Sequence, residues 1–337
     1  MVTASSTTPI DYRPDLDGLR GFAVIAVLLF HAFPSLAPAG FLGVDIFFVL
    51  SGFLITSLCV AQVDAGAFSF TRFYARRARR LFPALIVVLT AVSVLGWFTF
   101  SSKEFVALGR HVAAGAFFVP NIVLWKEAGY FDEAALRKPL LNLWSLGVEE
   151  QFYLVWPACL LWSGGRRRVS LAFAASALLA SFALAVTREG THAAETFYLL
   201  HARLWEPMAG AVLALLPHGP PSREPLRRDA LSLVGVVCIV GSCGDLAPGA
   251  EGTAWAALPA VFGACSVILA GPAALRAQAF QAPPPASEGL PQPVRARDPL
   301  LRAPLTGAST AATQPSAPRP PCPPTRARTY AFAVAAP

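Results

Sequence analysis

The sequence predicts an all-α protein, a polytopic transmembrane helix bundle, and three observations carry this prediction. Of the 337 residues 55% are hydrophobic and 14% are charged, whereas soluble proteins average about 25% charged residues. The apolar residues form long uncharged runs, which indicates that lipid surrounds much of the chain. The 24 Phe and 7 Trp exclude disorder over most of the length, because disordered segments are poor in aromatic residues.

Eight apolar runs approach the length of about 20 residues that a helix needs to cross a bilayer, and we expect each to be a full span. A further run, residues 112–125, is shorter and contains Pro120, so we expect a re-entrant segment there. The eight predicted spans are residues 21–33, with the uncharged run continuing to 44, then 41–60, 81–100, 146–162, 169–186, 199–216, 231–244 and 255–271.

Arginine-rich loops predict the orientation, because short loops rich in Arg and Lys stay on the cytoplasmic side. Residues 72–80, 166–168 and 223–228 are predicted to be such loops, which puts the N-terminus in the cytoplasm and residues 34–40 outside. A full crossing by residues 112–125 would place the later basic loops on the wrong side, which supports the re-entrant interpretation. We therefore expect a multi-pass protein of the cell inner (plasma) membrane.

Two domains are expected, a transmembrane domain at residues 1–272 and a tail at 273–337. The tail holds 14 of the 30 prolines, and such a composition predicts disorder because it cannot bury enough surface to offset ordering entropy. Residues 37–39 resemble a signal-peptide cleavage site. The segment before them is acidic rather than basic, so we expect the first span to remain uncleaved.

The net charge of +7 does not indicate a nucleic-acid partner. The tail contributes +5 of it, and the remaining +2 forms no basic surface with interleaved aromatic residues. The six cysteines lie mostly in apolar runs and show no CxxC spacing. They are interpreted as small core residues, and no metal site is expected.

Ionisable residues inside membrane spans are costly and are therefore functional candidates. Arg20 and His31 are 11 residues apart, close to three helical turns, which places both on one helix face about 16 Å apart. An anchoring Arg at the membrane surface with a hydrogen-bonded buried His is the structural alternative, and the spacing alone does not separate the two.

Several more charged residues are expected at the level of His31, in the outer half of the bundle, where they favour a polar cavity. The adjacent carboxylates at 149 and 150 point about 100° apart on a helix, so only one can face a given partner. The alternative is that both cap the N-terminus of the helix. The residues of this group are Asp45, Glu149, Glu150, Arg203 and Glu206.

Five ordered motifs resemble those of the integral-membrane acyltransferase-3 family, and together they cover about residues 11–272. The first is the Arg/His motif, LDGLRG at 16–21 followed by His31. The others are GFLGVDIFFVLSGFLIT at 40–56, the basic cytoplasmic loop at 72–83, the outer-loop element at 129–132 with LNLWSLGVEEQFYLVWP at 141–157, and RLWE at 203–206.

The resemblance implies an O-acyltransferase. It would move an acyl group, commonly acetyl from acetyl-CoA, to a hydroxyl of a glycan, a lipid-linked sugar or a small molecule at the outer side of the membrane. Acyl-CoA is then a co-substrate, and no bound cofactor is implied. Neutral imidazole suits the general base that this reaction needs, so the resemblance points to His31 as base or transient acyl carrier.

The remaining site residues also follow from the resemblance. Glu149 or Asp45 is expected to orient His31, with Glu150 in support, and Arg20 to steady donor phosphates or the developing oxyanion. The basic run is expected to bind the donor, with attraction to anionic lipid headgroups as the alternative; its members are Arg72, Arg76, Arg77, Arg79 and Arg80. The expected acceptor-binding residues are Asn142, Trp144, Ser145, Tyr153, Arg203 and Glu206.

Two departures from the family pattern are visible. Asn142 stands where the family has His, and an amide cannot take up a proton near neutral pH. After Pro272 the Ser-Tyr-x-Leu-Tyr-Leu-Trp-His motif of the family does not follow, so we expect C-terminal spans to be missing. A proton-coupled membrane transporter and an inactive truncated relic are the alternative functions.

Overall fold

The computed structural model describes residues 13–128, 138–217, 225–242 and 254–271, all of which lie within the unit Met1–Gln281. Helices and turns make up these residues, and no strand occurs among them, so the predicted all-α class is confirmed. The predicted tail at 273–337 and the predicted outer-loop motif at 129–132 lie outside the described residues.

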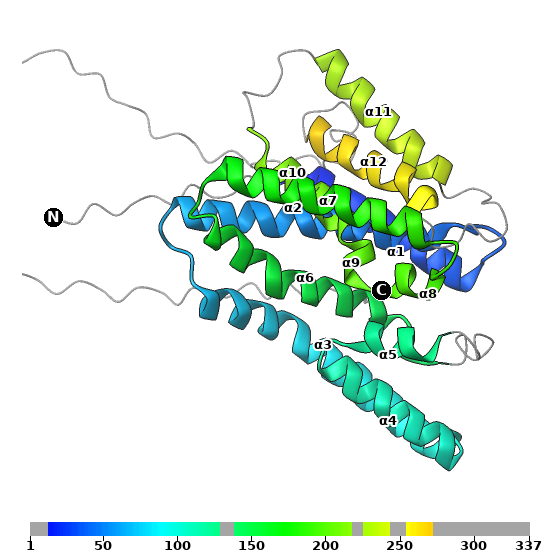
Figure 1. Cartoon of the computed structure of the whole chain (residues 1–337). Helices are drawn as coiled ribbons and strands as arrows, with labels where there is room; N and C mark the ends of the chain where they lie inside the picture. The colour runs from blue at the N-terminus through cyan, green and yellow to red at the C-terminus, as the bar shows by residue number, and fades with distance from the viewer. Residues whose placement is uncertain (1–12, 129–137, 218–224, 243–253, 272–337) are drawn as a thin grey trace, which may run out of the picture. The chain divides into compact units, whose positions relative to one another are not determined.

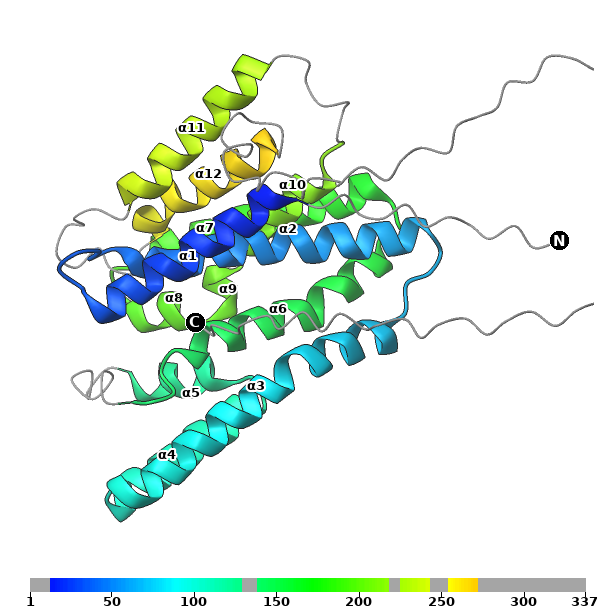
Figure 2. The same cartoon turned by 180° about the vertical axis from the view of Figure 1, so that it is seen from behind.

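Figures 1 and 2 show the arrangement of the helices from two opposite sides. Three segments, Gly40–Asp64, Phe70–Thr99 and Arg167–Arg188, are long and apolar enough to cross a membrane. The helices of the described residues are α1 (Pro14–Ala32), the 3-10 turn η1 (Gly40–Leu42), α2 (Gly43–Asp64), α3 (Phe70–Thr99), α4 (Ser102–Ala116), α5 (Pro120–Glu127), α6 (Leu143–Trp162), α7 (Arg167–Arg188), α8 (Ala193–Tyr198), α9 (Leu200–Arg203), α10 (Trp205–Leu215), α11 (Pro225–Ser242) and α12 (Ala254–Ala270).

Helix α2 is the central helix of the bundle and packs against α1, α6, α10 and α12. Of the residues in its most apolar stretch, 56% are buried, whereas only 17% are buried in the corresponding stretch of α3 and 22% in that of α7. Glycines allow the closest approach, between α2 and α10. A Cβ atom on Gly52 would lie 1.8 Å from the backbone oxygen of Pro207, and one on Gly210 would lie 1.9 Å from that of Val49. The α2–α10 crossing therefore depends on glycine at both positions.

Replacing Gly52 with Val is expected to destabilise the protein by about 3 kcal/mol or more, because the new side chain meets backbone that cannot rotate away. The measurement is the thermal unfolding midpoint of the purified protein in detergent. Gly109→Ala on α4 is the matched control, since no atom lies within 4 Å of a Cβ there. Equal midpoints for the two variants would contradict this packing.

The basic run is part of a helix, which corrects the prediction of a loop at residues 72–80. Ser69 caps the start of α3 by accepting a hydrogen bond from the Arg72 backbone N–H at 3.4 Å. The helix then continues through Pro83 to Thr99. Arginine has a good helix propensity, and Pro83 removes only the bond to Arg79, four residues earlier. The arginines are thus held in helical register.

The predicted span 199–216 is broken, which is a second correction. Arg203 ends α9, and Trp205 begins α10. Pro207 accounts for the break, because it has no N–H to donate to the Arg203 carbonyl and its ring crowds that carbonyl. The side chains of Arg203 and Glu206, one on each side of the break, are both buried.

The segment predicted to be re-entrant, residues 112–125, contains the end of α4 and most of α5. The chain reverses between them at Phe118, whose φ of 57° is unusual for a residue with a side chain, and Pro120 begins α5 in the first-turn position that suits proline. Helix α4 packs against α3 and α5 against α6. In both Figures 1 and 2 the α4–α5 hairpin starts and finishes at the same end of the bundle.

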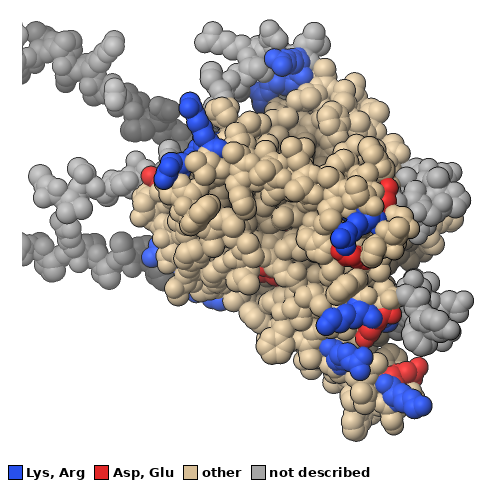
Figure 3. Space-filling model, viewed as in Figure 1, with Lys and Arg blue, Asp and Glu red and all other residues tan. Residues whose placement is uncertain are grey.

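Charged side chains gather toward the ends of the helices in the face shown in Figure 3, with a broad surface of other residues between them. Many large apolar side chains are exposed, among them Trp97 at 70%, Phe98 at 79% and Trp162 at 84%. An exposed apolar band between charged ends is the pattern of a protein whose sides face lipid.

Candidate active site

A buried ion cluster lies where α2 and α10 begin and α9 ends. Arg203 Nη1 donates to Asp45 Oδ1 at 2.7 Å and to Glu206 Oε1 at 3.0 Å. All three residues are at most 5% exposed. Glu206 Oε2 is buried and has no hydrogen-bond partner among the described residues. Two carboxyl groups thus share one guanidinium in the apolar interior, and removing that cation would be costly.

Aromatic residues cover the same guanidinium. The Arg203 Cζ atom lies 5.1 Å from the ring centroid of Phe197 and 5.7 Å from that of Trp144, and Arg203 Nε donates to the Phe197 carbonyl at 3.1 Å. Trp144 is 8% exposed and also contacts Phe48 and Tyr198. The structure therefore brings Arg203, Glu206 and Trp144, all predicted acceptor-binding residues, into one packed cluster with Asp45.

A second polar cluster joins α2, α3 and α6. Arg77 Nη2 lies 2.5 Å from Glu150 Oε1, and the Arg77 Cζ atom lies 3.4 Å from the centroid of the Tyr153 ring. The hydroxyls of Tyr153 and Ser51 both donate to Glu149 Oε1. The two adjacent carboxylates therefore have different partners, as their angular separation on a helix requires. They lie in the second turn of α6, so they do not cap its N-terminus.

The tip of the α4–α5 hairpin is fastened beside the second cluster. Gln151 Nε2 donates to Asn121 Oδ1 at 2.8 Å and to the Phe118 carbonyl at 3.1 Å. Asn121 is fully buried and donates to the Tyr198 carbonyl at 3.1 Å. Gly147 makes room for this contact, because a Cβ there would lie 2.9 Å from Asn121 Oδ1. Two residues of the 141–157 motif, Gly147 and Gln151, thus hold the tip of the hairpin.

His31 lies in the last turn of α1 and is exposed. Its Nδ1 is 2.8 Å from the Val27 backbone oxygen, and a carbonyl can only accept a hydrogen bond. In the neutral ring Nδ1 therefore carries the proton, and the lone pair of Nε2 is the one that can accept a proton. No carboxylate among the described residues lies within ion-pair distance of His31. Asp45 and Glu149, the carboxylates expected to orient this ring, contact Arg203 and the hydroxyls of Ser51 and Tyr153 instead.

Arg20 lies on α1 with His31, as the spacing predicts, and its Nη1 is 3.5 Å from Asp17 Oδ1. Both side chains of this ion pair, which are three residues apart on α1, are substantially exposed. Such a pair adds little stability, so the guanidinium of Arg20 is available to another anion.

The basic run divides into one engaged and four exposed arginines. Arg77 is held by Glu150, whereas Arg72, Arg76, Arg79 and Arg80 are exposed at the start of α3. Their remaining contacts are weak or local, such as Arg76 Nη2 to Gln62 Oε1 at 3.4 Å. Arg77 therefore differs from the other four arginines of the run predicted to bind the donor, because a carboxylate already holds its guanidinium.

The other predicted acceptor residues are at the start of α6. Asn142 is exposed and makes no side-chain capping bond. Ser145 is buried and its hydroxyl donates to the Asn142 carbonyl at 3.2 Å. Neither residue contacts His31, and the hydroxyl of Ser145 is occupied by its own helix.

Glu127, a carboxylate that the sequence did not single out, lies at the end of α5 and holds it against α4 through His111. Glu127 Oε2 accepts from Lys138 Nζ at 2.7 Å and lies 3.0 Å from His111 Nε2. Burial alone raises the pKa of Glu127, but its contacts with Lys138, His111 and Arg110 outweigh burial and leave the pKa below its ordinary value. No motif or spacing marks these residues in the sequence.

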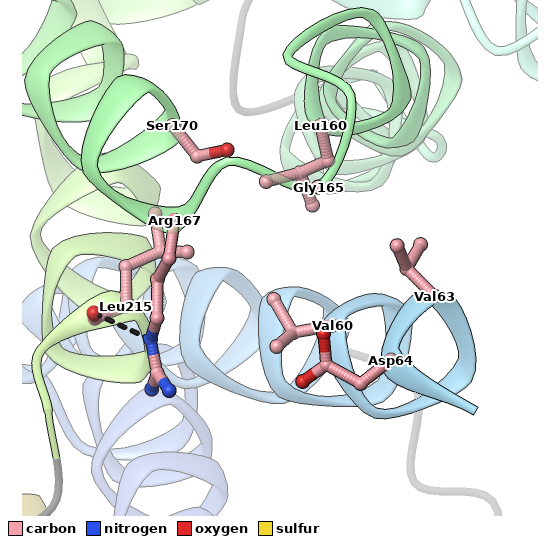
Figure 4. Close-up of a pocket in the computed structure, with 8 residues that line it drawn as sticks. All are labelled: Val60, Val63, Asp64, Leu160, Gly165, Arg167, Ser170 and Leu215. Carbon is pink, nitrogen blue, oxygen red and sulfur yellow. Dashed lines mark hydrogen bonds between the residues drawn. The ribbon is translucent and has the colours of Figure 1, made fainter. Parts of the chain in front are cut away.

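A small cavity lies between the ends of α2, α6, α7 and α10 (Figure 4). It measures about 30 Å³, which is room for about one water molecule. Arg167 on its wall donates to the Leu215 carbonyl at 2.9 Å, the dashed line in Figure 4, and so caps α10. This cavity is too small for a substrate.

The family model described as "Acyltransferase domain" (acyltransferase-3) matches residues 13–280. The peptidoglycan O-acetyltransferase OatA of Listeria monocytogenes is 37% identical over 212 residues, which is 61% of this chain and 34% of that protein. An uncharacterized protein of Haemophilus influenzae is 32% identical over 201 residues, 57% of this chain and 82% of that protein. The match therefore spans about a third of the length of OatA, and no solved structure matches the chain.

Proposed function

Because the chain belongs to the acyltransferase-3 family, we propose that it is a membrane-bound O-acyltransferase that moves an acetyl group to a hydroxyl of a carbohydrate or related acceptor. The observation that carries the proposal is the family match over residues 13–280, supported by a relative that is named as a peptidoglycan O-acetyltransferase. Acetyl-CoA is the proposed donor, and a cell-surface glycan, a lipid-linked sugar or a small hydroxyl compound is the proposed acceptor.

The proposed topology has eight spans in the inner (plasma) membrane, with the N-terminus in the cytoplasm. Helices α1, α2, α3, α6, α7, α11 and α12 cross singly, and α9 with α10 crosses as a broken span. The α4–α5 hairpin is re-entrant, which the fastening of its tip to Gln151 supports. This topology puts the arginines at the start of α3 on the cytoplasmic side and His31 on the outer side.

In the proposed reaction the acceptor oxygen attacks the thioester carbonyl of the donor. His31 Nε2 takes the proton of the hydroxyl as the new ester bond forms, and the sulfur leaves as the carbon–sulfur bond breaks and takes up a proton to become the thiol. The free lone pair on Nε2 supports this role. A transient acyl group on His31 is the alternative route to the same products.

The charged residues around this step have proposed supporting roles. Arg20 steadies the developing oxyanion or a donor phosphate. The exposed arginines at the start of α3 bind the phosphates of the donor, because guanidinium groups match phosphate oxygens in pairs. The cluster of Arg203 with Asp45 and Glu206, together with Asn142, Trp144 and Ser145, shapes the acceptor side.

The test of this function is transfer of labelled acetyl from acetyl-CoA to a glycan acceptor in membranes that contain the full chain. We expect label in the glycan, dependent on the protein. Membranes with an empty vector are the control. Uptake of unmodified acceptor without labelling would instead indicate a transporter, and neither uptake nor labelling by a folded preparation would indicate an inactive protein.

A further inference from the structure

The segment that joins α1 to α2, residues 33–43, packs back onto the second half of α1. Figure 2 shows α1 and α2 side by side, connected by this return segment at one end. A Cβ on Gly40 would overlap the Ala26 backbone oxygen, and one on Gly43 would lie 2.5 Å from that of Ala23. Backbone therefore lies directly against backbone, which fixes the end of α1 relative to the return segment.

Aromatic contacts extend this packing to the imidazole ring of His31. The ring of Phe41, in η1, lies 5.5 Å from that of Phe30, centroid to centroid, at an interplanar angle of 69°. The Phe30 ring in turn lies 5.2 Å from the His31 ring at an angle of 87°. Both are edge-to-face arrangements, which aromatic pairs favour. The return segment is thus connected to His31 through one intervening ring.

The orientation of the imidazole has two determinants. The edge-to-face contact with Phe30 restrains the plane of the ring. The hydrogen bond from Nδ1 to the Val27 carbonyl, 2.8 Å long, selects which nitrogen faces the helix, because a half turn of the ring would bring a carbon to that carbonyl instead. Val27 follows Ala26, the residue against which Gly40 packs. Both determinants therefore depend on the return segment.

We propose that Phe30 and Phe41 are positioning residues for His31, which hold its ring so that Nδ1 keeps the bond to Val27 and Nε2 is the nitrogen presented to the acceptor hydroxyl. The proposal rests on the proposed function for the step in which Nε2 takes a proton. It gives the start of the 40–56 motif a role that acts through Phe30.

The first test does not depend on activity. Nitrogen-15 NMR of the histidine-labelled full chain in detergent, at alkaline pH, separates the neutral ring protonated at Nδ1 from the ring protonated at Nε2. The His31 signals are identified by their absence in His31→Ala. Phe41→Leu removes an aromatic contact and should lower the ratio of the Nδ1–H to the Nε2–H form about fivefold, whereas Phe41→Tyr keeps the ring and should keep the ratio. An unchanged ratio in Phe41→Leu would overturn the proposal.

A second variant shows whether the effect passes through Phe30. Phe30→Leu should lower the same ratio at least as much as Phe41→Leu does. Adding Phe41→Leu to Phe30→Leu should then change the ratio by less than about twofold, because the two residues act in series. Independent effects of the two substitutions would overturn the proposal.

Phe105→Leu is the matched control. The half-buried ring of Phe105 makes a similar edge-to-face contact on α4, 5.4 Å from the ring of Trp97 at 79°, and α4 packs against α3 and α5. Its replacement should leave the His31 ratio at the parent value. A change as large as that in Phe41→Leu would overturn the proposal, because it would reflect a general loss of structure.

The second test uses acyl transfer. Phe41→Leu should lower kcat about fivefold with the KM for acetyl-CoA unchanged, and Phe41→Tyr should retain the parent kcat. In a His31→Ala background Phe41→Leu should alter the remaining rate less than about twofold. An equal loss with and without His31 would overturn the proposal. A change in the ring ratio in a protein that transfers no acetyl would uphold the positioning role and refute the proposed function.

Discussion

Arg203→Met is expected to destabilise the protein by about 3–5 kcal/mol, the usual cost of removing one partner from a buried ion pair. Two carboxyl groups, Asp45 and Glu206, share this guanidinium at 2.7 and 3.0 Å. Their cluster joins the start of α2, the end of α9 and the start of α10, so its loss should separate the helices that cross at Gly52. The thermal unfolding midpoint and the monodisperse fraction of the purified protein in detergent measure the effect.

Two controls identify the cause of that loss. Arg188→Met removes a comparable ion pair to Glu195 at 3.0 Å, but the Arg188 side chain is 46% exposed, so the cost should be below about 1 kcal/mol. Adding Asp45→Asn and Glu206→Gln to Arg203→Met removes the unpaired charges and should recover a large part of the stability. If Arg203→Met unfolds at the same temperature as Arg188→Met, the cluster does not hold the helices together.

His31→Ala is expected to lower kcat for acetyl transfer by about 10²–10⁴-fold, the range that a general base contributes. The ring is exposed at the end of α1 and its Nδ1 hydrogen bond is to the Val27 carbonyl of its own helix, so the unfolding midpoint should change little. Activity and stability are measured on the same preparation, which separates a chemical role from a structural one.

His192→Ala is the matched control for that substitution. His192 is also exposed, and its Nδ1 lies 2.8 Å from the Thr191 hydroxyl, yet it belongs to no motif of the site. Its replacement should leave kcat within about twofold of the parent value, as is usual for surface changes away from the reacting groups. If His31→Ala keeps more than about a tenth of the parent rate, then His31 is neither the base nor the acyl carrier.

The helical fold could be predicted from composition and periodicity because both are local. Runs of uncharged apolar residues predicted helices at α1, α2, α6, α7 and α12 close to their observed positions. The prolines in these runs were harder to interpret. The α9–α10 break at Leu204 depends on Pro207, whereas Pro83 lies inside the unbroken helix α3. Proline permits either outcome, and packing around it selects one.

The candidate site was predicted as a set of residues but not as a set of contacts. Arg203 with Glu206 could be expected to lie near each other, since they are one turn apart, and Asp45 was placed at their level by its position in a span. Nothing in the spacing indicated that Arg77 would meet Glu150 or that Ser51 would meet Glu149. These pairs join residues 73 and 98 positions apart, and such distances along the chain carry no periodic signal.

The amino-acid sequence by itself determined the helical class and the motifs that identify the family, because hydrophobic runs and ordered signatures are properties of short segments. Only the tertiary structure decided which charged side chains became partners. It paired Arg77 with Glu150, and Arg203 with Asp45 and Glu206, and it placed none of the carboxylates in the described part of the chain within ion-pair distance of His31. The physical reason is that a buried charge must find an opposite charge or hydrogen bonds within a few ångströms, and helix packing sets which groups come that close.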